Sequence, residues 1–198
     1  VLYMLNHGLS TGALFFLVGM MYERYHTRDM NVIGGLASKM PVWSFFMVFF
    51  VLASVGLPGL NGFVSEFMCL LGTFIASPSD ANWPGVLGPT YAAIAALGMV
   101  LAAMYLLIMV GKMVFGKLRE PEQTSEHTSL PVDLSAREIG VLVPLAALCI
   151  WIGVQPTVLT NAMGGSVESL LAPYPKLVEK HLESQTTIVE IVEEGQHG

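Results

Sequence analysis

The feature that most constrains the fold of this chain is an apolar run at residues 42–76 that breaks near its middle. A straight helix crosses a bilayer with about 20 residues, so this run is too long for a single span. The break has the sequence GLPGLNGFVSEF (residues 56–67), in which Pro58 lacks an amide donor and clashes with the preceding turn. Gly59 and the neighbouring glycines weaken a helix further. We therefore predict two half-helices joined by non-helical backbone near residues 56–62.

Three further apolar runs predict more membrane spans, and the composition agrees with them. These runs cover residues 1–22, 86–110 and 139–155. The chain is 54% hydrophobic and 12% charged, whereas a soluble domain has roughly 25% charged residues. We predict an all-α fold, a polytopic transmembrane helix bundle with one discontinuous helix. Residues 1–156 would hold four spans, and residues 157–198 would form a polar, acidic tail.

The distribution of basic residues predicts the orientation of the chain. The loops at 23–41 and 111–138 hold seven Lys and Arg, against two in the tail and none in the loop at 77–85. Cytoplasmic loops carry an excess of Lys and Arg, so we expect the loops at 23–41 and 111–138 in the cytoplasm and the tail outside. The chain starts without an initiator Met, inside an apolar run, and we expect it to be a fragment of a longer protein.

Several classes of function are excluded by what the sequence lacks. The net charge is −6 and no basic patch is interleaved with aromatic residues, so no nucleic-acid partner is expected. Cys69 and Cys149 lie in apolar segments without ligand spacing, which argues against a disulfide framework, a zinc site or an iron–sulfur cluster. The glycines of the break lie at membrane depth, where phosphate binding is not expected. We expect no cofactor and no metal in this chain.

Glu66 is the strongest candidate for a functional residue. A charge near the bilayer centre costs about 2.5–3.5 kcal/mol, and such residues usually face a bundle interior or a hydrated path. Broken helices mark ion sites in transporters. We interpret Glu66 as a proton-relay group, supported by Pro58 and Gly59 of the break and by Asn61 and Ser65, which lie one helical turn apart. The alternative is a neutral, hydrogen-bonded Glu66 that serves only packing.

His7 is the second candidate. It forms a polar stripe with Ser10 and Thr11 at i, i+3 and i+4 on an otherwise apolar helix. The pKa of histidine lies near physiological pH, and ionisable residues inside a membrane are usually functional. We interpret His7 as a further proton-relay residue, with Ser10 and Thr11 in support. Structural hydrogen bonding is the alternative.

Three stretches of the sequence resemble a known family. They are HGLSTGALFFLVGMMYERYHTRDM (7–30), GGLASKMPVWSFF (34–46) and LASVGLPGLNGFVSEFMCLLG (52–72). They are similar to the C-terminal part of the antiporter-like membrane subunit M of NADH:quinone oxidoreductase (respiratory complex I), which is subunit 4 in mitochondria. The resemblance covers about residues 1–76. It implies that the chain holds the last four of fourteen membrane helices, of which the twelfth is discontinuous.

The resemblance also implies roles for individual residues. The relay carboxylate of the family falls on Glu66, and its central-axis histidine falls on His7. The related subunits L and N and the Mrp antiporters typically have a lysine at the position of Glu66, which favours subunit M. The family's upstream Glu and Lys, in its fifth and seventh helices, are not in this chain.

The function implied by the resemblance is coupling of electron transfer from NADH to quinone to proton pumping. The chain would be part of an oxidoreductase and translocase without redox-active residues of its own. NADH, FMN, iron–sulfur clusters and quinone would be bound in other subunits. The partners would be neighbouring antiporter-like subunits of complex I, the lipid bilayer and protons. The expected location is the cell inner (plasma) membrane, with an organellar membrane as the alternative. The alternatives are a subunit of an Mrp-type cation/proton antiporter or membrane-bound hydrogenase, and a structural membrane scaffold.

Overall fold

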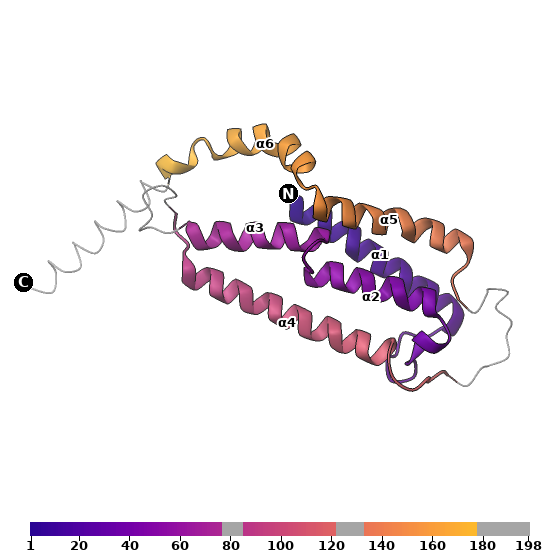
Figure 1. Ribbon diagram of the computed structural model, residues 1–198. Coiled ribbons are helices and arrows are strands. Elements are labelled where there is room, and N and C mark those ends of the chain that lie inside the picture. The colour runs from indigo at the N-terminus through magenta and orange to yellow at the C-terminus, as the bar shows by residue number, and fades with distance from the viewer. Residues whose placement is uncertain (77–84, 122–132, 178–198) are drawn as a thin grey trace, which may run out of the picture. The chain divides into compact units, whose positions relative to one another are not determined.

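The chain is described by a computed structural model over residues 1–76, 85–121 and 133–177, and it is helical (Figure 1). The only strand-like pairing in these ranges is an isolated bridge between Gly34 and Arg119. The predicted all-α fold with one discontinuous helix is confirmed. The elements are α1 (Leu2–Tyr25), the 3₁₀ turn η1 (Leu36–Ser38), α2 (Pro41–Val55), α3 (Asn61–Ile75), α4 (Pro89–Met113), α5 (Ala136–Val154) and α6 (Thr157–Leu171).

Three helices are long and apolar enough to cross a membrane, judged by length and composition: α1, α4 and α5. The apolar helices α2 and α3 are shorter, with 15 residues each. At 1.5 Å per residue each reaches about 22 Å, less than the hydrocarbon core of about 30 Å. The two helices follow each other across the predicted break, so neither needs to cross the core alone.

The first half of the broken helix ends at Gly56. This residue adopts a left-handed conformation (φ +85°), which glycine reaches without the steric penalty of a Cβ atom. The amide of Leu57 donates to the carbonyl of Leu52 at 3.0 Å, the six-residue closure of a Schellman motif. The last turn of α2 is therefore closed by its own backbone.

The unwound segment consists of residues 56–60. Pro58 lies where no helical hydrogen bond requires its missing N–H group. Gly59 again has a positive φ, of +93°, and α3 begins two residues later at Asn61. The local conformation thus follows from proline and glycine chemistry, and the segment falls within the interval predicted from the sequence.

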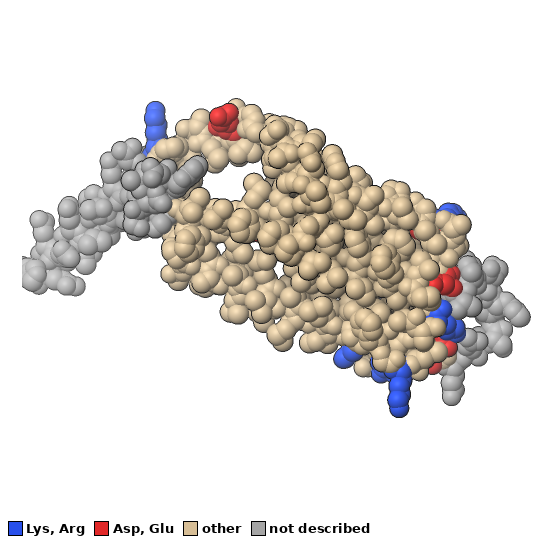
Figure 2. All heavy atoms as spheres, in the orientation of Figure 1, with Lys and Arg blue, Asp and Glu red and all other residues tan. Residues whose placement is uncertain are grey.

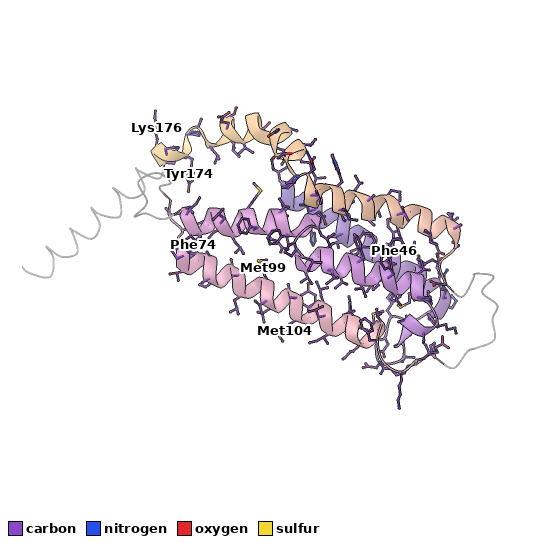
Figure 3. The ribbon with its side chains drawn as sticks, viewed as in Figure 1. Phe46, Phe74, Met99, Met104, Tyr174 and Lys176 are labelled. Atoms are coloured by element: carbon purple, nitrogen blue, oxygen red, sulfur yellow. The ribbon has the colours of Figure 1, made fainter. Side chains whose placement is uncertain are left out.

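The chain divides into two compact units, of which the first comprises Val1–Phe67 and Gly98–Pro156. Within this unit α1 packs along α2 and α5. On α2, Trp43 is fully buried, and its indole N–H donates to the carbonyl of Leu17 at 2.9 Å. Phe46, labelled in Figure 3, belongs to the same core. One face of α1 is buried at the i, i+3 and i+4 spacing of an amphipathic helix: Leu2, Asn6, Ser10, Ala13, Leu17 and Met21.

Two loops at one end of the first unit pair with each other, and we call residues 26–40 and 114–121 the loop cluster. Gly34 and Arg119 exchange both backbone hydrogen bonds, at 3.1 and 2.8 Å. Figure 2 shows charged side chains gathering at this end, whereas the surface over α2 carries no charge in this view. Polar backbone and charge are thus kept together, away from the apolar helices.

Side chains reinforce the loop cluster. The ammonium of Lys39 lies 2.6 Å from the carboxylate of Glu120, and the hydroxyl of Tyr25 donates to the same carboxylate at 2.8 Å. Burial by itself would raise the pKa of Glu120, but the hydrogen bonds from Lys39 and Tyr25 hold this pKa below its ordinary value. Glu120 is therefore ionised at neutral pH and ties the end of α1 to both loops.

A second charged pair connects α1 to α5 and α2. The guanidinium of Arg24 donates to both carboxylate oxygens of Glu138 at 2.9 Å, and also to the carbonyl of Asp133 at 2.9 Å. The Asp133 carboxylate accepts the amides of Val42 and Trp43, at 2.8 and 3.1 Å. A residue from the segment before α5 thus caps the N-terminus of α2.

The second unit comprises Met68–Leu97 and Thr157–Gly198. Within it, the amide of Leu87 donates to the carbonyl of Ala76 at 3.0 Å, which joins the end of α3 to the approach of α4. The predicted tail begins with α6, none of whose residues is buried. Tyr174 and Lys176, labelled in Figure 3, follow α6. The rest of the predicted acidic tail, residues 178–198, lies outside the described part of the chain.

Candidate functional site

Glu66 lies in the second turn of α3, directly against the broken backbone. A Cβ atom built on Gly56 would overlap the Oε2 atom of Glu66, so the carboxylate rests on the Cα of that glycine. The side chain is half-buried, and Oε2 itself is buried without a hydrogen-bond partner among the described residues. Gly56 is therefore required twice, for its positive φ and for the space occupied by the carboxylate.

Two further glycines allow backbone segments to close around the break. A Cβ atom on Gly62 would overlap the carbonyl oxygen of Ala53, near the end of α2. A Cβ atom on Gly153, near the end of α5, would overlap the carbonyl oxygen of Gly59. Close approach of this kind is possible only where side chains are missing. The break is thus held between α2, α3 and α5.

The first turn of α3 is hydrogen-bonded to α1 through Asn6. The Nδ2 atom of Asn6 lies 2.7 Å from the carbonyl oxygen of Asn61 and 3.1 Å from the hydroxyl of Ser65. In return, Nδ2 of Asn61 donates to the carbonyl of Asn6 at 3.1 Å. The hydroxyl of Ser10 donates to the same carbonyl at 3.1 Å. These four residues form a polar cluster, which we call the asparagine cluster.

Buried oxygen atoms without a partner concentrate at the break. Five such side-chain atoms occur among the described residues: three belong to the break or to the asparagine cluster, and a fourth, on Ser54, lies two residues before Gly56. A buried acceptor without a donor costs about 1–3 kcal/mol, so such a group calls for an explanation. The atoms are Oδ1 of Asn6, Oγ of Ser44, Oγ of Ser54, Oδ1 of Asn61 and Oε2 of Glu66.

The structure brings some of the predicted residues together and separates others. Asn61, Ser65 and Glu66 meet at the break, and Ser10 joins them through the carbonyl of Asn6. His7 lies on the exposed side of α1, stacked on Tyr3 with 6.0 Å between the ring centroids.

The predicted stripe of His7, Ser10 and Thr11 is therefore split. The hydroxyl of Thr11 lies 3.4 Å from Nδ1 of His7, while Ser10 is buried. The cause is helical geometry, since successive residues are about 100° apart around the axis. Pro58 and Gly59 are exposed on the described chain and act through the backbone that they shape.

Reasoning from the sequence missed Asn6, although the sequence contains a pattern that reveals this residue. Asn6 and Ser10 stand four residues apart, in phase with the buried Ala13 and Leu17. A polar pair in phase with an apolar stripe indicates a hydrogen-bonded helix contact. The proton-relay role was assigned to the neighbouring His7 instead, because the chemistry of a histidine is more distinctive. Gly153 had no comparable signal.

Nothing in the described residues indicates a metal site. Residues 1–76, 85–121 and 133–177 contain no group of three or more His, Cys, Asp and Glu placed to hold an ion. Cys69 is exposed and Cys149 is buried, and both are free thiols. The chemistry that this part of the site offers is proton exchange at a carboxylate, on the same helix as the amide of Asn61 and the hydroxyl of Ser65.

The fold defines a class, that of membrane helix bundles built around a discontinuous helix. Residues 1–83 match the family described as NADH:quinone oxidoreductase/Mrp antiporter, TM. The predicted resemblance to subunit M of NADH-quinone oxidoreductase is confirmed by the relatives. The chain is a multi-pass membrane protein.

The relatives come from bacteria and from plants. Subunit M of NADH-quinone oxidoreductase from Rhodobacter capsulatus is 38% identical over 171 residues, which are 86% of this chain and 30% of the relative. The Pseudomonas aeruginosa subunit M is 39% identical over 86% of this chain and 30% of its own length. NADH-ubiquinone oxidoreductase chain 4 of Marchantia polymorpha is 37% identical, over 86% of this chain and 31% of its own. The chain thus spans about three tenths of the length of these relatives.

Two solved structures share the fold. Respiratory complex I from Thermus thermophilus with bound NADH contains a chain that matches with a TM-score of 0.60 and 29% identity, over 78% of this chain and 29% of that one. The membrane-bound sulfane sulfur reductase, an archaeal respiratory membrane complex, matches with a TM-score of 0.57 over 76% of this chain and 22% of that one. At 23% identity this second similarity concerns the fold alone.

Proposed function

We propose that the chain is part of a proton-translocating membrane subunit of NADH:quinone oxidoreductase, where it couples electron transfer from NADH to quinone to proton pumping. The identity to subunit M over most of the chain supports this assignment. NADH, FMN, the iron–sulfur clusters and quinone would bind other subunits, and this chain would perform no redox step. Its partners would be neighbouring antiporter-like subunits, lipid and protons, in the cell inner membrane.

The observation that carries the proposal is the position of Glu66. Its carboxylate lies on Gly56, at the point where the C-terminus of α2 and the N-terminus of α3 meet. The two helix ends carry partial charges of opposite sign, so the protonation of a carboxylate here depends on small movements of the backbone at the break. Unpartnered oxygen atoms lie nearby. In the proposed mechanism Glu66 takes up and releases a proton at this place.

The other predicted residues have supporting roles in the proposed mechanism. Asn61 and Ser65 provide polar groups beside Glu66. Pro58 and Gly59 keep the backbone unwound. His7 would pass protons between the centre of the subunit and Glu66, with Thr11 beside it.

Two other functions are open to test. A subunit of an Mrp-type cation/proton antiporter or membrane-bound hydrogenase is favoured by the family description, which includes the Mrp antiporters. It predicts proton movement that depends on a cation gradient rather than on NADH oxidation. A structural scaffold, in which Glu66 serves only packing, predicts that the loss of this carboxylate has no effect.

The test measures proton pumping and NADH:quinone turnover in inverted membrane vesicles that carry the full-length subunit. Assembly of the complex is quantified for each variant. General acid–base groups contribute about 10²–10⁴-fold, so we expect Glu66→Gln to lower both activities by at least about tenfold. Glu66→Asp should retain much of each activity because it keeps a titratable carboxyl. Glu168→Gln on the exposed helix α6 is the matched control. Wild-type activity of Glu66→Gln would overturn the proposal.

A further inference from the structure

Asn6 occupies an unusual position on α1. Its side chain is 1% exposed, while the neighbouring Leu5 is 52% exposed and His7 is also exposed. A buried amide is unfavourable unless it is hydrogen-bonded. An apolar residue at position 6 would pack without needing hydrogen bonds. The hydrogen-bond partners of Asn6 therefore indicate why the chain has an amide at this position.

All partners of the Asn6 amide nitrogen lie in the first turns of α3. Nδ2 donates to the carbonyl of Asn61 at 2.7 Å and to the hydroxyl of Ser65 at 3.1 Å. These two acceptors are four residues apart and lie on the same face of α3. Asn61 adds a bond in the opposite direction, from its own Nδ2 to the carbonyl of Asn6 at 3.1 Å. One residue of α1 is thus bonded three times to one helical turn.

Such an arrangement fixes the rotation of α3 about its own axis. Apolar side chains tolerate small rotations, whereas hydrogen bonds depend on direction and weaken steeply when misaligned. Glu66 follows Ser65 directly, about 100° further around the helix. Its carboxylate rests on Gly56, so a rotation of α3 would move the carboxylate along or away from the break.

We propose that Asn6 is a positioning residue that sets the rotation of α3 on α1 and thereby aims Glu66 at the break. The consequence for proton transfer rests on the proposed function of Glu66, whereas the positioning itself does not. Asn6 contacts neither the carboxylate nor Gly56 through any recorded hydrogen bond in the described chain, and it acts through Asn61 and Ser65.

The test uses Asn6→Leu in the full-length subunit within the assembled complex. Leucine has nearly the shape of asparagine and suits an apolar helix, so the variant removes the hydrogen bonds while it keeps the bulk. Two quantities are measured in vesicles with verified assembly. The first is NADH:quinone turnover, and the second is the rate at which dicyclohexylcarbodiimide labels Glu66, followed by mass spectrometry of the modified peptide.

We expect labelling of Glu66 to become severalfold faster in Asn6→Leu, since the carboxylate would leave its place on Gly56. Turnover should fall by about tenfold at unchanged KM for quinone, because misplacement by about 1 Å can cost about 100-fold. Ser65→Ala removes the Asn6–Ser65 bond and should act in the same direction with a smaller effect. If Asn6→Leu does not assemble, Ser65→Ala decides the matter by the same two measurements.

The matched control is Thr73→Ala on the same helix, where the lost hydroxyl bonds only the carbonyl of Cys69 at 2.8 Å. Both quantities should stay at wild-type values in this control. Wild-type labelling in Asn6→Leu would overturn the positioning role, and so would wild-type labelling in Ser65→Ala. Faster labelling in Asn6→Leu, together with full activity of Glu66→Gln, would uphold the positioning role and reject the proposed function of Glu66.

Discussion

Gly56 is the residue at which local backbone chemistry and the candidate site depend on each other most directly. It closes α2 with a φ of +85°, and its missing Cβ leaves the space where Oε2 of Glu66 lies. An ordinary residue in the left-handed region costs about 1–2 kcal/mol, which a membrane bundle can tolerate. The collision with the carboxylate cannot be relieved without moving Glu66.

We therefore expect Gly56→Ala to assemble and, with Glu66 in its proposed role, to lower proton pumping and turnover together by about tenfold. The activities are measured in inverted vesicles, with the amount of assembled complex as reference. Gly72→Ala on α3 is the control, because a Cβ atom there meets nothing within 4 Å. Full activity of Gly56→Ala would mean that the position of the carboxylate is unimportant.

For individual residues, the sequence predicts local chemistry better than it predicts contacts with distant parts of the chain. The conformations of Pro58 and Gly59 follow from their covalent structure, which explains why the break was predictable. The partners of Asn6 were not predictable, because a single sequence does not show that residues 6 and 61 meet. His7 had distinctive chemistry, but its neighbour in the chain makes the buried contact.

Among the elements, α5 has the least conspicuous sequence and holds the break at a critical point. It begins with a capping box formed by Ser135 and Glu138, and Arg24 binds the same glutamate. Near its other end Gly153 packs against the backbone of Gly59. This helix was predicted from its apolar length alone. The S-x-x-E spacing of Ser135 and Glu138 also marks its start in the sequence, whereas the contacts with Arg24 and Gly59 leave no pattern that a single chain reveals.

This contact gives a prediction for the element. In Gly153→Ala the added Cβ would overlap the carbonyl oxygen of Gly59, so α5 and the break must move apart. Backbone is on both sides of the contact, and no flexible side chain can yield. We expect turnover to fall severalfold, with faster carbodiimide labelling of Glu66.

The same helix provides the comparison for this prediction. Gly140→Ala adds a Cβ atom that meets nothing within 4 Å, and it should behave as wild type in both measurements. Equal behaviour of the two variants would show that α5 does not restrain the break.

Across the whole molecule, apolar and charged surfaces are separated. In the most apolar 18-residue stretch of α4 only 11% of the residues are buried within the chain. Met104 on this helix, labelled in Figure 3, is 56% exposed. A helix that is apolar on all sides is suited to lipid or to neighbouring membrane helices. In the first unit, charged side chains instead gather at the end that holds the loop cluster. Composition predicts this division, whereas the pairing of Lys39 with Glu120 across 81 residues could not be foreseen.

The loop cluster gives a prediction for the stability of the molecule. The pKa of Glu120 is lowered in the folded chain, so its contribution is fully present above the ordinary carboxyl pKa of about 4.3 and is lost as the pH falls through the lowered value. Lys39 and Glu120 are 28% and 23% exposed, and partly exposed pairs contribute about 0–1 kcal/mol. We therefore expect Glu120→Gln to lower the melting temperature at pH 7 by about 1–3 °C.

The pH dependence of the melting temperature distinguishes the loss of the Lys39–Glu120 ion pair from a general effect of the substitution. The difference in melting temperature between wild type and Glu120→Gln should stay constant from pH 7 down to about 4.3 and shrink below that, because only as the pH falls through the lowered pKa does the wild-type carboxylate gain a proton and resemble the amide. Intrinsic fluorescence of the purified complex follows the transition, and Glu168→Gln on α6 serves as the exposed control. A difference that stays constant even well below pH 4 would show that the Lys39–Glu120 pair does not tie the loops together through charge.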